Sequence, residues 1–148
     1  MKKNPPQPIP EGRPTVIPYL VINDVAKAID FLKATFDAEE KERIPRADGS
    51  VMHAELVIGN GMVMMGEPNE EFGPMPASIF ISVEDCDAVY QRAIAAGGIS
   101  VMEPADMHHA GERYGGVKDH AGNIWWMATH IEDLSEEEAK RRAKEMGL

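Results

Sequence analysis

The sequence contains a single cysteine, Cys86, and no hydrophobic run as long as a membrane-spanning helix. One cysteine excludes an intrachain disulfide and is typical of the reducing cytoplasm, where we expect this protein to reside. Crossing a bilayer takes about 18–20 consecutive apolar residues, so no membrane partner is expected. The lysines at positions 2 and 3 are followed by prolines instead of an apolar segment, which argues against a secretory signal peptide.

The chain is also poor in basic residues relative to acidic ones. Its 15 Lys and Arg residues against 25 Asp and Glu residues give a formal net charge of −10 over 148 residues. Most of such a surface would repel a phosphate backbone, so nucleic acid is not expected as a partner. The excess negative charge favours solubility.

The sequence does contain one pattern twice. Residues 19–33 and 80–94 each place an apolar strand before an Asp and an amphipathic helix after it, and Asp24 aligns with Asp85. Further strand and turn residues follow each helix. A repeat of about sixty residues is too long for one solenoid unit and too short for an independent domain. We therefore predict an α+β fold in which two βαβββ modules share one core.

The repeat also predicts how the chain is divided. A proline-rich N-terminal arm is expected over residues 1–14, a single domain over residues 15–134 and a C-terminal helix over residues 135–148. Within the single domain, the two modules are expected at residues 15–67 and 77–130. The five prolines of the arm prevent a helix or a central strand there.

Several segments predict local geometry. A strand is expected over residues 16–22, at a sheet edge or with a bulge, because Pro18 has no N–H. In the second module, a strand over residues 99–102 is expected to lead into a loop over residues 103–112, with His108 and His109 in solvent. The spacing of apolar residues predicts the inward helix faces as Val25, Ala28, Ile29, Leu32 and Phe36 in the first module and Val89, Ala93 and Ile94 in the second.

Cys86 falls at the start of the second predicted helix. The helix dipole there would lower the pKa of a thiol. The alternative is that Cys86 is simply a small, partly buried residue.

Residues 51–58 predict which side of the sheet is open. The even-numbered positions of this strand are all apolar, whereas the odd-numbered positions include His53 and Glu55. Because side chains alternate between the faces of a strand, the even-numbered face should pack under the helices and the odd-numbered face should be open. A His and a Glu so placed can shape a ligand cavity, work as an acid–base pair or bind a metal.

The same alternation predicts a binding cavity. Trp125 and Trp126 must face opposite sides of their strand, one in the core and the other in the pocket or a subunit contact. Arg113 and Tyr114 are expected to close one rim. The residues expected to line the partly apolar cavity are Tyr19, His53, Glu55, Ser78, Phe80 and Trp126.

These segments resemble the vicinal oxygen chelate superfamily, which includes glyoxalase I, extradiol dioxygenases and bleomycin-resistance proteins, and in particular its PhnB-like branch. The resemblance covers about residues 8–146. It implies paired βαβββ modules, a cup-shaped mixed sheet within one subunit or across a dimer, and frequent homodimers. The segments that carry it are residues 9–12, 15–20, 51–59, 83–89, 112–119 and 122–130.

The resemblance also implies where a metal would bind. Metal-dependent members take four ligands from the first and last strands of each module. The matching positions here hold Ile17, Met65, Ser78 and Trp126, and none of these is a ligand for zinc or a hard metal. Glu67 would supply an acid only if the register slipped by two residues. We therefore expect no metal at these positions and no cofactor.

Together these observations predict a protein that binds a small organic ligand in a partly apolar cup. Its free strand edges, including the strand that contains Pro18, predict a homodimer. The alternative is a metal-dependent or acid–base lyase, isomerase or dioxygenase that uses His53 and Glu55.

Overall fold

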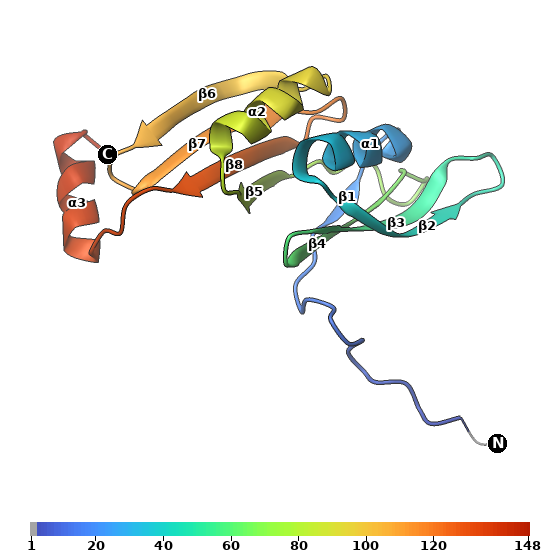
Figure 1. Cartoon of the computed structure of the whole chain (residues 1–148). Coiled ribbons are helices and arrows are strands. Elements are labelled where there is room, and N and C mark those ends of the chain that lie inside the picture. The colour runs from blue at the N-terminus through green and yellow to red at the C-terminus, as the bar shows by residue number, and fades with distance from the viewer. Residues whose placement is uncertain (1–2) are drawn as a thin grey trace.

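The structure, a computed structural model, describes residues 3–148, so Met1 and Lys2 of the predicted arm lie outside the described residues. Within that range, no helix is long and apolar enough to cross a membrane. Figure 1 shows the elements in chain order: β1 (Tyr19–Val21), α1 (Val25–Phe36), β2 (Glu39–Pro45), β3 (Val51–Ile58), β4 (Gly61–Gly66), β5 (Ser78–Ser82), α2 (Cys86–Ala95), β6 (Ile99–Met107), β7 (Glu112–Lys118), β8 (Ile124–His130) and α3 (Glu136–Glu145).

The two modules have the same sheet topology. The first sheet has the strand order β1-β4-β3-β2 and the second sheet has the order β5-β8-β7-β6. In each sheet the first strand pairs in parallel with the last strand of its module, and the other pairs are antiparallel. The predicted α+β fold of two paired βαβββ modules followed by a C-terminal helix is confirmed.

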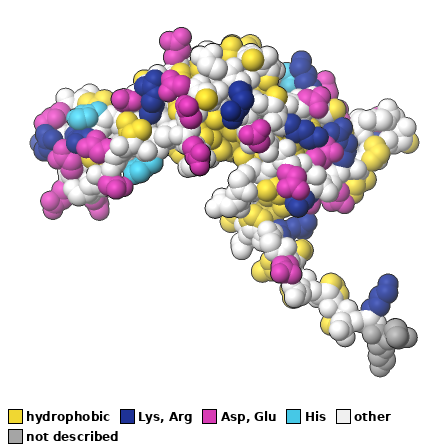
Figure 2. All heavy atoms as spheres, in the orientation of Figure 1, with side chains coloured by type: hydrophobic (Ala, Val, Ile, Leu, Met, Phe, Trp, Pro, Cys, Tyr) yellow, Lys and Arg dark blue, Asp and Glu magenta, His cyan; other side chains and the backbone are white. Residues whose placement is uncertain are grey.

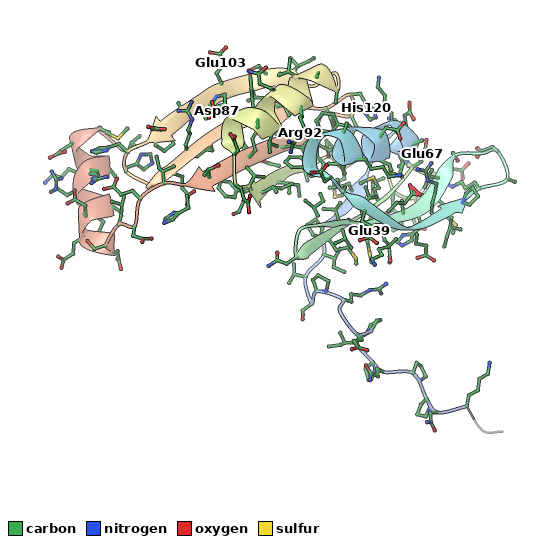
Figure 3. All side chains as sticks on the ribbon, viewed as in Figure 1. Glu39, Glu67, Asp87, Arg92, Glu103 and His120 are labelled. Atoms are coloured by element: carbon green, nitrogen blue, oxygen red, sulfur yellow. The ribbon has the colours of Figure 1, made fainter. Side chains whose placement is uncertain are left out.

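The helices of the two modules lie on the same side of the molecule, α1 over the first sheet and α2 over the second (Figure 1). They meet in the middle, where Arg92 Nε donates a hydrogen bond to the carbonyl oxygen of Thr35 at 3.2 Å. A second link joins the modules at the β7–β8 turn, where His120 Nε2 lies 2.9 Å from the carbonyl oxygen of Asn23. Figure 3 labels both Arg92 and His120. Each sheet therefore has one face covered by a helix and an opposite face that we call its open face.

The core lies between the helices and the sheets. All five residues predicted for the inward face of α1 are buried, and so are Val89 and Ala93 of α2. The prediction for Ile94 was wrong, since Ile94 is partly exposed and α2 instead buries Cys86 and Tyr90.

Two strand predictions require correction, and a proline explains each. The first strand is shorter than expected because Pro18 has no N–H to donate, although its carbonyl oxygen accepts from Met64 N at 2.9 Å. The loop predicted from residue 103 is instead a continuation of β6 to Met107. The pairing of β6 with β7 shifts register between Met102 and Ala105, which accommodates Pro104 within the strand.

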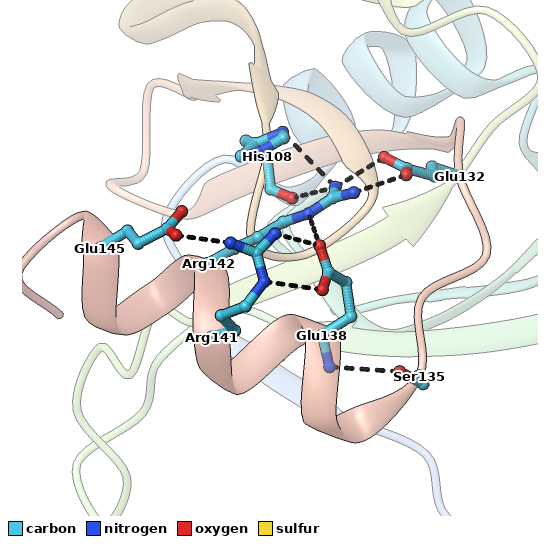
Figure 4. Close-up of polar contacts among 7 residues, drawn as sticks. All are labelled: His108, Glu132, Ser135, Glu138, Arg141, Arg142 and Glu145. Carbon is cyan, nitrogen blue, oxygen red and sulfur yellow. Dashed lines mark hydrogen bonds and ion pairs between the residues drawn. The ribbon is translucent and has the colours of Figure 1, made fainter.

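The C-terminal helix α3 is held by charged groups, because none of its residues is buried. It begins at the predicted cap, where Ser135 Oγ accepts a hydrogen bond from Glu138 N at 3.1 Å. Arg142 donates to the Glu132 carboxylate at 2.7 and 2.8 Å and to the His108 carbonyl oxygen at 3.0 Å (Figure 4). His108 is exposed, as predicted, whereas His109 is only partly exposed and its Nδ1 atom is buried, so the prediction for His109 was wrong.

Candidate functional site

The open face of the first sheet carries a row of side chains that crosses all of its strands. Strand register places Tyr19 beside Met64, Met64 beside Glu55, and Glu55 beside Glu42. Residues paired across strands share a face, so these side chains lie together. Ala54 and Leu56 are fully buried in the core on the other face. The predicted placement of Glu55 opposite Ala54 and Leu56 is thus confirmed.

A bulge changes the faces at the start of β3. Ile44 pairs with His53 and Pro45 pairs with Val51, so Met52 is the extra residue between them. As a result Val51 is buried in the core cluster, whereas Met52 is 46% exposed. Simple alternation had predicted the reverse for both residues, and that prediction was wrong.

His53 lies at the centre of a group of polar side chains on the first sheet. Its Nδ1 atom lies 3.0 Å from Tyr19 Oη, and the two rings stack with their centroids 5.6 Å apart. Its Nε2 atom lies 3.3 Å from Glu55 Oε1 and 3.9 Å from Glu42 Oε2. Glu55 is only 7% exposed and also accepts from Arg13 Nη2 at 2.9 Å. We call these five residues the polar cluster.

The electrostatics of the polar cluster follow from partial burial. Burial raises the pKa of the Tyr19 phenol above its ordinary value, although the positive charge of Arg46 opposes the shift. The phenol is therefore protonated at neutral pH and can hydrogen-bond to the imidazole of His53. The carboxylates of Glu42 and Glu55 give this face a negative charge. Arg13 of the N-terminal arm forms an ion pair with Glu55 and so offsets one of the two charges.

The open face of the second sheet carries aromatic side chains. Tyr114 makes edge-to-face contacts with Trp126 and Phe80, with ring centroids 6.0 and 6.2 Å apart. Trp126 Nε1 donates to Ser78 Oγ at 2.8 Å. A β-carbon at Gly116 would lie 2.6 Å from carbons of the Trp126 ring, so glycine lets the indole approach β7 this closely. We call Ser78, Phe80, Tyr114 and Trp126 the aromatic cluster.

A buried carboxylate orients the strand behind the aromatic cluster. Trp125 is fully buried on the helix side, as alternation predicted for one of the two tryptophans. Its Nε1 donates to Asp119 Oδ2 at 2.9 Å, and Asp119 also accepts from Asn123 Nδ2 at 2.8 Å. Since Trp125 is held in the core, its neighbour Trp126 must project from the open face.

Arg113 is not brought to either cluster. Its guanidinium donates to both carboxylate oxygens of Asp87 on α2, at 2.7 and 2.8 Å, and to Asp106 at 3.0 Å. These hydrogen bonds hold the pKa of the Asp87 carboxyl below its ordinary value. Figure 3 labels Asp87, which lies on the helix side of the second sheet. Arg113 therefore joins α2 to the sheet.

Neither of two cavities described within residues 3–148 borders both clusters. A cavity of about 770 Å³ lies where the modules meet, and Phe80 is its one lining residue from either cluster. A second cavity of about 360 Å³ borders Tyr19 together with Met52 and Phe72. In Figure 2, hydrophobic side chains reach the surface in the middle of the molecule, with charged groups around them. Apart from Arg113, the predicted site residues thus lie in two groups, one on each sheet.

The positions of the superfamily metal site do not suit a metal ion. Met65 is buried in the core, and the Trp126 indole donates its N–H to Ser78. Glu67, labelled in Figure 3, accepts hydrogen bonds from the backbone N–H groups of Asp24 and Val51, so its carboxylate is used within the fold. Ile17 has no donor atom in its side chain, so these positions provide neither imidazole nor a free carboxylate.

Comparisons with known proteins agree with this fold. The sequence model of the Glyoxalase/Bleomycin resistance protein/Dioxygenase superfamily matches residues 15–127. An uncharacterized protein of Mycobacterium bovis is 33% identical over 145 residues, which cover 90% of this chain and 95% of that protein.

Solved structures show the same arrangement. TioX from Micromonospora sp. ML1 is 29% identical with a TM-score of 0.67, over 78% of this chain and 98% of that one. A PhnB protein from Bacillus cereus, described as a putative 3-demethylubiquinone-9 3-methyltransferase, is 20% identical with a TM-score of 0.62. That match covers 78% of this chain and 99% of the other. At this identity the second likeness concerns the fold alone.

Proposed function

The chain belongs to the Glyoxalase/Bleomycin resistance protein/Dioxygenase superfamily. We propose that it binds a small organic ligand between the open face of a first sheet and the open face of a second sheet. The observation that carries this proposal is the chemistry of those faces. One presents the aromatic rings of Phe80, Tyr114 and Trp126, and the other presents a few polar groups around His53. Apolar and aromatic walls with a small number of placed polar groups are typical of small-molecule sites.

The proposed cup requires a second copy of the chain. Both open faces lie on the side away from α1 and α2 (Figure 1), and neither of the two cavities described above borders both clusters. A two-fold axis between the modules would set the first sheet of one protomer against the second sheet of its partner, which gives two equal cups. Tyr19 and Phe80, which are 45% and 56% exposed, would then be covered.

Light scattering measures directly whether the protein is a dimer in solution. Light scattering at micromolar concentration is expected to give about twice the chain mass of 16.3 kDa. A mass equal to that of the single chain would contradict the proposed cup.

Ligand binding can be measured with phenylnaphthylamine, a neutral aromatic fluorophore. We expect saturable binding to the wild-type protein and a loss of about tenfold in affinity for Trp126→Ala, because ring contacts contribute about 0.5–1.5 kcal/mol beyond the area they bury. Ile99→Ala is the matched control, since Ile99 is also an exposed apolar residue of the second module but lies outside the aromatic cluster. Equal affinities for the two variants would contradict the proposal.

A further inference from the structure

We propose that Glu42, His53 and Glu55 bind a divalent transition-metal ion on the open face of the first sheet. Each of these residues offers one ligand atom, and the three atoms all lie within 4.8 Å of one another. An imidazole nitrogen with two carboxylate oxygens suits ions such as Mn²⁺, Fe²⁺, Co²⁺ and Zn²⁺. This inference goes beyond the proposed binding of an organic ligand and does not depend on it.

The site differs from the superfamily metal positions in its place in the fold. Its ligands come from β2 and β3, whereas the superfamily positions lie on the first and last strands of each module. Glu42 pairs directly with Glu55 across the two strands, and His53 precedes Glu55 by two residues on the same face. A register shift between Glu40 and Glu42 puts Glu42 opposite Glu55. Neighbouring strands thus hold all three ligands on a rigid support.

The orientation of His53 suits a metal ligand. Tyr19 Oη lies 3.0 Å from Nδ1, which leaves Nε2 directed at Glu55 and Glu42. Metal-binding histidines commonly hold their second ring nitrogen against an oxygen partner in this way. In the tautomer in which Nδ1 donates its proton to Tyr19 Oη, Nε2 carries a lone pair that can bind a metal ion held by the two carboxylates.

Arg13 of the N-terminal arm is the competitor for this position. Its guanidinium contacts the same Glu55 oxygen that faces His53, at 2.9 Å. A metal ion that binds Glu55 must therefore displace Arg13 or share the carboxylate with it. Glu42 is different, because within residues 3–148 its side chain makes no hydrogen bond and forms an ion pair only with His53, at 3.9 Å. Its carboxylate is available to a metal without cost to the fold.

The test is a titration of the full-length protein with Co²⁺, followed by the visible absorption of the bound ion. We expect one Co²⁺ per chain for the wild type and no such band for His53→Ala. Glu42→Gln should weaken binding by at least about tenfold, because even residues that only orient a ligand contribute about 10–100-fold to metal affinity. Glu39→Gln is the matched control, since Glu39 lies on the same strand, carries the same charge and pairs with Lys41.

Two more variants test the roles of the neighbours. Tyr19→Phe should weaken Co²⁺ binding by about tenfold without changing the stoichiometry, because Tyr19 orients the imidazole. Arg13→Ala should strengthen binding, because it removes the competing cation. Thermal melting confirms that each variant is folded. The proposal is overturned if Glu42→Gln and Glu39→Gln bind Co²⁺ equally well, or if the wild type shows no stoichiometric binding. No organic ligand is present, so such a failure would leave the proposed cup standing.

Discussion

Replacing Asp119 by alanine should be among the most destabilising single changes in this protein. Asp119 is 6% exposed and accepts four hydrogen bonds, from Trp125 Nε1, from Asn123 Nδ2, and from the backbone N–H groups of Asn123 and Ala121, at 2.8–3.0 Å. The side chains of Trp125 and Asn123 are fully buried, so solvent does not reach these two donors in the native fold. A buried donor left without a partner costs about 1–3 kcal/mol.

With two such side-chain donors, we expect Asp119→Ala to lower the free energy of unfolding by about 3–5 kcal/mol. That is a large share of the roughly 5–15 kcal/mol that stabilises an ordinary domain. Asp119→Asn keeps one acceptor oxygen and should cost less. Equilibrium unfolding in urea, followed by tryptophan fluorescence at a fixed protein concentration, measures both effects.

Asp106→Asn is the control for the loss of one carboxylate. Asp106 is exposed and pairs with Arg113, so its replacement should cost about 0.2–1 kcal/mol, as for other surface ion pairs. If Asp119→Ala cost no more than Asp106→Asn, the account of how β8 is oriented would be refuted.

Three further predictions concern single side chains. Gly116→Ala should displace the Trp126 indole, because a β-carbon there would lie 2.6 Å from its ring, and an unchanged emission spectrum would argue against this. Hydrogen bonds that His130 donates to the carboxylates of Asp133 and, to a smaller extent, Glu112 raise the pKa of its imidazole. The contribution of protonated His130 to the stability of the folded chain should be complete below the ordinary histidine pKa of about 6.5. This contribution should be lost as the pH rises through the raised folded-state pKa. Unfolding free energies of the wild type and His130→Ala should therefore converge at alkaline pH, and a constant difference would contradict this. Burial raises the pKa of the Cys86 thiol, so iodoacetamide should label the native chain far more slowly than the urea-unfolded chain, whereas equal rates would refute its burial.

The repeat in the sequence was enough to predict the fold, because each module carries its own strand, cap and helix pattern. Asp24 and Asp85 both cap their helices, with side chains that accept from Lys27 N and Ala88 N. Alternation then separated Trp125 from Trp126, because each strand buries only the face that meets a helix.

The parts of the candidate site that sequence could not predict depend on pairing between strands. Met52 is the extra residue of a bulge, which no local pattern reveals. Glu42 enters the polar cluster only through the register of β2 against β3. Arg13 reaches Glu55 from an arm that sequence predicted only as extended. Arg113 was expected beside Tyr114 at the end of a loop, but β7 already begins at Glu112, so alternation sends the two side chains to opposite faces.

The central claim is that a binding cup forms between the first sheet of one protomer and the second sheet of its partner. Tyr19→Glu places a charge on the first face and Phe80→Glu places one on the second, and both positions are exposed enough to spare the fold. Each homodimeric variant should fail to bind phenylnaphthylamine. In a heterodimer of the two variants, purified through two different tags, one cup carries both charges and the other carries neither.

Fluorescence titration of that heterodimer is the most direct measurement of the claim. The account predicts about one bound fluorophore per heterodimer, which is half the wild-type number for a dimer with two equal cups. A cup formed within a single chain would be damaged in both protomers. A heterodimer that binds no fluorophore, while the wild type binds two, would therefore contradict the account.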